Sequence, residues 1–173
     1  QDRAARSAAR LGFVWGLGHA TSLVVFGLPV VLYRAYLPES LQRDAETAVG
    51  VMIVILALRL LRRSRHGHWH GATRAPAQAY VIGLVHGTGG TAGIGLLLLA
   101  AIPSHPLAVG SLLVFAFCTA VSMAILSGGF GLTLDRPRAR GAFYRIAPVM
   151  ACVSLAFGVW YALGAQNLVP YVF

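Results

Sequence analysis

Residues 107–134, with the sequence LAVGSLLVFAFCTAVSMAILSGGFGLTL, contain no charged side chain. A helix of about 20 apolar residues is long enough to cross the ~30 Å hydrocarbon core of a membrane. The stretch also lacks the strict apolar–polar alternation that a membrane β-strand would need. It therefore predicts a membrane-spanning helix, and its glycine-rich segment at 127–131 is expected to bend or unwind.

Four other apolar blocks surround this stretch in a chain of 173 residues, of which 57% are hydrophobic and 11% charged. A soluble domain usually has about 25% charged residues to wet its surface. We therefore predict an all-α fold, a polytopic integral membrane helix bundle that forms a single transmembrane domain over residues 1–173. The predicted five transmembrane helices are residues 11–33, 45–61, 79–102, 107–134 and 146–165.

The charged residues alternate between the two sides of this predicted bundle. All 14 basic residues are arginines, and most precede the first span, lie in residues 62–78 or lie between the last two spans. Because arginine is enriched in cytoplasmic loops, the N-terminal flank is predicted to be cytoplasmic and the C-terminus outside, in a cell (inner or plasma) membrane. Nucleic acid is excluded as a partner because no basic stripe is interleaved with polar and aromatic residues on a soluble face. The lipid bilayer is the expected surrounding.

Two histidines interrupt the apolar spans in similar surroundings. His19 lies in GLGHATS (16–22), and His86 lies in GLVHGTGGT (83–91). Each is about seven or eight residues inside its span, roughly 10–12 Å deep at 1.5 Å per residue. Neutral imidazole is a good ligand for divalent nickel, cobalt, zinc or copper. The alternative is that both histidines only form hydrogen bonds between helices.

Hydroxyl groups near these histidines are candidates for weak ligands or supporting contacts, and the glycines around residues 87–95 are a candidate helix interruption. The hydroxyl residues concerned are Thr21, Ser22, Thr88 and Thr91. Trp15, near the end of the first span, is expected to be an interfacial anchor.

A second candidate metal site is the basic cytoplasmic loop at 62–78, which carries alternating histidines. His66, His68 and His70 can chelate a late transition metal weakly, although an ordinary polar linker is an equal alternative. His105, in a proline-flanked turn, is expected to be a wet loop residue. Cys118 and Cys152 lack a CxxC partner, and their simplest interpretation is as small buried apolar residues.

Three segments carry a resemblance to a known family. RLGFVWGLGHATSL (10–23), AVGVM (48–52) with the basic histidine loop after it, and GLVHGTGGTA (83–92) resemble the NicO-type nickel/cobalt transporters, including UreH-like urease accessory membrane proteins. The resemblance covers nearly the whole chain. It implies a helical membrane protein of six spans that moves Ni²⁺ or Co²⁺ as its transported ion, with no tightly bound cofactor.

The sequence departs from that family in one respect. Its members typically carry an earlier helix with a His-x4-Asp-His signature, which this sequence lacks, and no acidic residue is expected in the core of any span. Either that helix precedes Gln1 or this protein has lost the usual metal site, and the start at Gln1 rather than Met favours the first. His19 and His86 would then be the remaining ligands.

The sequence therefore predicts a transporter of divalent metal ions and not an enzyme, since no hydrolase, kinase or dinucleotide signature is present. Uptake and efflux are both open, as is assembly into a homo-oligomer. Two alternatives come from other classes. One is a membrane thiol-redox protein that relays electrons through Cys118 and Cys152, and the other is a non-transporting accessory protein that delivers metal to a metalloenzyme.

Overall fold

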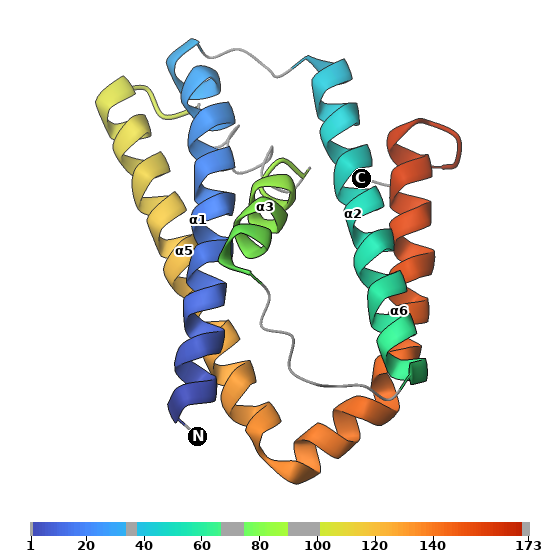
Figure 1. The fold of residues 1–173 in the computed structure, drawn as a ribbon. Helices are drawn as coiled ribbons and strands as arrows, with labels where there is room; N and C mark the ends of the chain where they lie inside the picture. Colours follow the sequence, from blue (N-terminus) through green and yellow to red (C-terminus); the bar gives the residue numbers. More distant parts are fainter. Residues whose placement is uncertain (1, 34–37, 67–74, 90–100, 171–173) are drawn as a thin grey trace.

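The computed structural model describes residues 2–33, 38–66, 75–89 and 101–170. The regular structure of these residues is entirely helical (Figure 1). The five helices of the described residues are α1 (Asp2–Tyr33), α2 (Glu39–His66), α3 (Pro76–His86), α5 (His105–Asp135) and α6 (Pro137–Ala165).

Helix α1 is the central element, with α5 packed along one side and α3 against another (Figure 1). Small residues bring α1 and α5 together as an antiparallel pair. An added Cβ at Gly16 would lie only 2.6 Å from the Cα of Ala120, and Gly12 lies directly against Ser127. At the other end of the pair, the buried cluster consists of Val30, Val31, Ala108 and Leu112. Close contact through small side chains is the usual basis of helix association in lipid, where burial of apolar surface gives little advantage.

Helices α2 and α6 form a second antiparallel pair, which also packs closely through small residues. A Cβ at Gly50 would lie 2.7 Å from the Cβ of Ala162, and one at Gly158 would lie 2.9 Å from a methyl group of Ile53. Figure 1 shows this pair standing apart from α1 and α5, with α3 between the two. The α5–α6 connection therefore joins two separately packed helix pairs.

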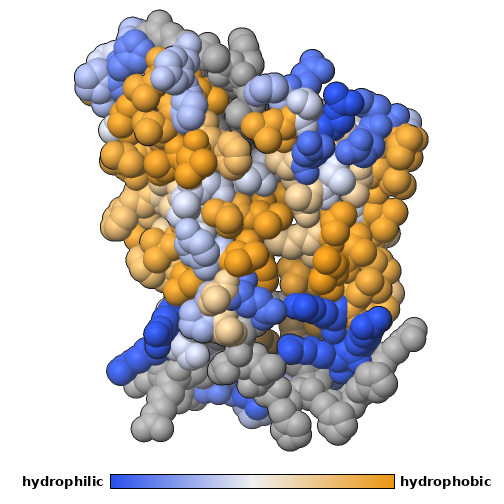
Figure 2. All heavy atoms as spheres, turned by 45° about the horizontal axis from the view of Figure 1, so that its top comes forward, coloured by the Kyte–Doolittle hydropathy of each residue, from blue (hydrophilic) through white to orange (hydrophobic). Residues whose placement is uncertain are grey.

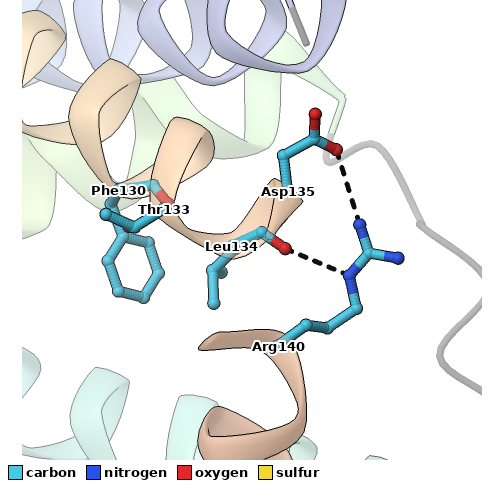
Figure 3. A network of polar contacts seen from close by, with 5 residues as sticks. All are labelled: Phe130, Thr133, Leu134, Asp135 and Arg140. Carbon is cyan, nitrogen blue, oxygen red and sulfur yellow. Dashed lines mark hydrogen bonds and ion pairs between the residues drawn. The ribbon is translucent and has the colours of Figure 1, made fainter. Parts of the chain in front are cut away.

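That connection is a sharp elbow with a single non-helical residue, Arg136, between the two helices. The Nε of Arg140 donates a hydrogen bond of 3.0 Å to the carbonyl oxygen of Leu134, and its guanidinium lies 3.5 Å from the carboxylate of Asp135 (Figure 3). Arg140 thus donates to one of the carbonyl groups that the end of α5 leaves without a helical partner. Pro137 begins α6, where its missing N–H costs nothing because the first N–H groups of a helix have no partner within it. The sequence analysis assigned residues 135–145 to a loop, and this assignment is wrong because the proline starts the helix early.

Among the described residues, three helices are long and apolar enough to cross a membrane: Ala5–Tyr33, His105–Asp135 and Pro137–Ala165. Many of their large apolar side chains are exposed. Phe117, Ile125 and Leu126 of α5 are 66%, 67% and 72% exposed. Figure 2 shows the hydrophobic residues as a broad band, with hydrophilic residues gathered toward the ends of the molecule. Exposed apolar surface of this extent marks a surface that faces lipid or protein rather than water.

The other spans differ from prediction. Helix α2 begins at Glu39, six residues before the predicted start at Ala45, and reaches His66. Helix α3 begins at Pro76 and ends at His86, so helical residues extend into both sides of the predicted 62–78 loop. The turn at residues 87–89 agrees with the predicted interruption, whose remaining glycines lie outside the described residues.

Two further expectations about α5 and α6 are corrected. The glycine-rich segment at 127–131 does not unwind, because α5 stays helical to Asp135 and Gly128 packs against Ala9 of α1. Cys118 and Cys152 are free and exposed rather than buried. In an all-apolar helix, sequence periodicity does not separate the face that meets protein from the face that meets lipid.

Candidate functional site

The candidate site lies where α3 crosses α1, and glycines determine how close the two backbones come. Gly18 of α1 lies against the carbonyl of Tyr80, and Gly83 of α3 lies against the carbonyl of Trp15. A Cβ at Gly87 would lie 2.8 Å from the carbonyl oxygen of His19. Along α1, Trp15 and Gly18 meet Gly83 and Tyr80 in the reverse order, as expected where one helix crosses another at close range.

This close crossing brings the two predicted histidines to the same level. The rings of His19 and His86 have centroids 5.6 Å apart and are tilted by 37°. Two imidazoles that share one metal at about 2.1 Å hold their ring centroids roughly 4.5–6.5 Å apart. The pairing of His19 with His86, predicted from their matching depth, is therefore present in the structure at a spacing compatible with one shared ion.

Trp15 forms the third side of this aromatic group. Its ring lies 5.6 Å from that of His86, centroid to centroid, one helical turn before His19 on α1. Sequence analysis expected an interfacial anchor at this position, whereas the structure places the indole against the histidine pair. Trp15, His19 and His86 therefore form one group of neighbouring rings.

Two polar atoms of this group are buried without a hydrogen-bond partner among the described residues, namely Nδ1 of His19 and Nε1 of Trp15. Leaving a buried donor or acceptor unsatisfied costs about 1–3 kcal/mol, so native proteins rarely keep such atoms without a reason. The indole nitrogen can only donate, while an imidazole nitrogen can accept a proton or bind a metal. His19 Nδ1 therefore has a lone pair or proton position that no described residue uses and that a metal could take.

The neighbouring hydroxyl groups connect the two helices rather than standing free. Ser22 Oγ is buried and donates to the carbonyl oxygen of Leu84 at 2.5 Å. Tyr80 donates to Thr21 Oγ1 at 3.0 Å, and Thr21 itself donates to Leu17 within α1. These bonds fix the register of α1 and α3 on which the histidine pair depends.

Thr88 follows the end of α3 and turns back on it. Its Oγ1 donates to the carbonyl oxygen of Val85 at 2.7 Å, and its backbone N–H donates to the same oxygen at 3.2 Å. The carbonyl of Leu84 is thereby left for Ser22, which explains why the helix stops beside the histidine pair. Each of these hydroxyl oxygens still has a lone pair that could bind a metal. Weak metal coordination by Thr21, Ser22 and Thr88 therefore stays a prediction.

The other predicted ligands are not brought to this site by the described residues. Thr91, His68 and His70 lie outside the described ranges, and His66 is described only as the last residue of α2. In the part of the chain that the structure describes, no group of three or more His, Cys, Asp or Glu side chains is arranged to hold a metal ion. The described site is therefore a two-histidine site.

Sequence analysis missed one buried acid. No acidic residue was expected in the core of any span, but Glu46, the second residue of the predicted span 45–61, lies two turns inside α2 and is only 5% exposed. Its carboxylate accepts a hydrogen bond of 3.1 Å from Gln42. One turn further on, Val49 packs against Gly89, just after the end of α3. Helical periodicity could have indicated the burial of Glu46, because Glu46 lies on the same face of α2 as the buried residues Val49 and Ala57.

Comparison with known proteins agrees with the sequence resemblance. The chain is 25% identical over 169 residues to the urease accessory protein UreH of Bacillus sp. (strain TB-90), covering 87% of this chain and 73% of that protein. The predicted resemblance to the NicO-type, UreH-like family is confirmed. No family model and no solved structure matches the chain. The UreH-like resemblance and the helices long enough to cross a membrane together indicate a membrane protein.

Proposed function

We propose that the chain is a membrane transporter of Ni²⁺ or Co²⁺ that passes the ion between His19 and His86. The observation that carries the proposal is the His19–His86 pair itself, two imidazoles whose ring centroids lie 5.6 Å apart where α3 crosses α1. Imidazole suits late first-row metals, and a polar group inside a membrane is expensive unless it serves a function. The relationship to a urease accessory protein supports nickel as the ion.

A site with two nitrogen ligands fits transport better than storage. A transported ion must bind well enough to enter and weakly enough to leave, whereas structural metal sites usually have four ligands. The remaining positions around the ion would be filled by water or by the hydroxyl oxygens of Thr21, Ser22 and Thr88. Uptake and efflux would both use the same pair.

The proposal includes a membrane arrangement. The chain would cross the cell inner or plasma membrane five times, with its N-terminal flank in the cytoplasm and its C-terminus outside. The support is the distribution of arginine between alternate connections, as the positive-inside rule requires. The His19–His86 pair would then lie in the cytoplasmic half of the bilayer.

The direct test is transport of radioactive nickel into proteoliposomes by the native protein and by single alanine variants. His19→Ala and His86→Ala are each expected to lower transport and nickel affinity by at least about tenfold, the size of effect seen when a metal site loses a supporting group. His105→Ala is the matched control, since His105 is exposed at the start of α5. Transport unchanged in both site variants would refute the proposal.

A second candidate is a non-transporting accessory protein that delivers metal to a metalloenzyme, and the name of the relative favours it. The same experiment separates the two. Nickel binding that depends on His19 but occurs without transport into vesicles would favour the accessory role. For thiol-redox relay through Cys118 and Cys152, the exposed and unpaired state of both cysteines offers no support.

A further inference from the structure

Two apolar grooves meet at the arginine-rich end of α2. One, of about 520 Å³, lies between α2 and α6 and is lined by apolar residues that include Ile53, Leu60 and Phe143. The other, of about 300 Å³, lies between α2 and α3 and is lined by residues that include Met52 and Val81. Both grooves share three lining residues: Leu56, Arg59 and Gln78.

The polar groups at this junction are cationic or amide groups. Arg59 and Arg63 lie one helical turn apart on the same face of α2, and both line the larger groove. Both are exposed, and neither forms an ion pair with an acid of the described residues. The nearby carboxylate of Asp135 lies 3.5 Å from Arg140 instead. The junction therefore presents the positive charges of Arg59 and Arg63 and the amide donor of Gln78 where the two apolar grooves meet.

We propose that this junction binds one anionic diacyl phospholipid. Its phosphate group would lie between Arg59, Arg63 and Gln78, and one acyl chain would occupy each groove. Guanidinium groups recognise phosphate through charge-assisted hydrogen bonds, and basic pockets between membrane helices at the cytoplasmic side are suited to anionic headgroups. A free phosphate ion would leave the two apolar grooves unfilled, whereas a phospholipid matches both the charge and the apolar surface.

Such a lipid would contact α2, α3 and α6 at once. Helix α2 makes few contacts with α3 in the described residues, so a molecule seated between them would add contacts that the protein itself lacks. The inference rests on the membrane location in the proposed function but not on metal binding. The two proposals can therefore fail separately.

The test is native mass spectrometry of the protein in dodecyl maltoside micelles, titrated with phosphatidylglycerol or with phosphatidylcholine. Each arginine near an anionic lipid surface strengthens binding about fivefold, so Arg59→Gln/Arg63→Gln should weaken phosphatidylglycerol binding roughly 30-fold. The control, Arg62→Gln/Arg136→Gln, removes the same charge from residues outside both grooves. It is expected to keep the affinity of the native protein.

A second variant tests the apolar part of the site. Ser154→Phe places a large ring in the groove between α2 and α6 and keeps both arginines. It should weaken binding of phosphatidylglycerol but not of lysophosphatidylglycerol, whose single chain can use the other groove. Equal losses in the two arginine double variants, or equal binding of phosphatidylglycerol and phosphatidylcholine by the native protein, would overturn the lipid site. Nickel binding measured on the same samples reports separately on His19 and His86.

Discussion

Gly83 lies where α3 crosses α1, and replacing it with alanine tests whether the closeness of the two backbones holds the histidine pair together. The new Cβ would lie 2.9 Å from both the carbonyl carbon and the ring Cδ1 of Trp15, and closer still to the carbonyl oxygen. Ordinary contacts of this kind begin at 3.4 Å, so the two atoms at 2.9 Å would have to move back by about half an ångström and the carbonyl oxygen by considerably more. The obstacle is largely backbone, which cannot rotate away as a side chain can.

The size of the effect follows from two opposing terms. Overpacking costs about 1–3 kcal/mol, and the rigid carbonyl puts this case toward the upper end. Alanine gains about 0.5–1 kcal/mol over glycine inside a helix. Gly110→Ala in α5 is the matched control, because its Cβ would meet nothing within 4 Å. The two variants share the propensity gain, so their difference of about 1–3 kcal/mol isolates the packing term.

The assay is thermal unfolding in detergent followed by circular dichroism, with nickel affinity measured on the same samples. A chain of this size shifts its Tm by about 2–4 °C for each kcal/mol, so Gly83→Ala should melt below Gly110→Ala by several degrees. Gly83→Ala should also weaken nickel binding, because His86 lies one turn further along α3 and moves with it. Equal melting temperatures and equal nickel affinity in the two variants would refute the argument.

Three further predictions concern single contacts. Ser22→Ala leaves the carbonyl of Leu84 without its hydroxyl donor and should lower the unfolding free energy by about 0.6–1.7 kcal/mol, the range for hydrogen bonds between membrane helices. Thr119→Ala removes an exposed hydrogen bond within α5 and should lower the unfolding free energy by less. Equal unfolding free energies for the two variants would contradict this prediction. Glu46→Lys puts an ammonium group at a position that is only 5% exposed, so it should destabilise the fold by several kcal/mol and lower the yield of folded protein. Asp44→Lys changes an exposed residue of α2 and should give folded protein in normal yield, as judged by gel filtration. Arg140→Gln removes the contacts of a half-exposed side chain and should change the unfolding free energy by less than about 1 kcal/mol. A larger loss of unfolding free energy in a denaturant titration would show that this prediction is wrong.

Part of the site was predictable because the membrane imposes a common reference plane. Residues 11–33 and 79–102 were predicted to start at the same face, so His19 and His86 had to lie at similar depth. Their ring centroids are 5.6 Å apart, which agrees with that reasoning. The prediction did not need to know which faces of the two helices touch, since histidine is rare enough in apolar spans to be noticed wherever it points.

The contacts of Trp15 and Glu46 could not be predicted in the same way. The position of Trp15 near a span end is equally typical of an interfacial anchor, and only the crossing angle of α3 brings its ring to His86. Glu46 followed a proline and several charged residues, as a loop residue would. Its burial is a property of the packed helices, since the charge pattern around it does not distinguish it from the exposed Asp44 two residues earlier.

The sequence by itself determined that the chain is helical, that its apolar stretches are suited to a membrane, and that two histidines share one level. These properties depend on the length, composition and spacing of single segments. Only the tertiary structure decided that Gly12 and Gly16 face α5 while Gly18 faces α3, and that α3 ends at His86. Lipid is as apolar as the side chains it surrounds, so helix pairing is decided by the fit of small residues and by hydrogen bonds between particular atoms, which no pattern within one helix records.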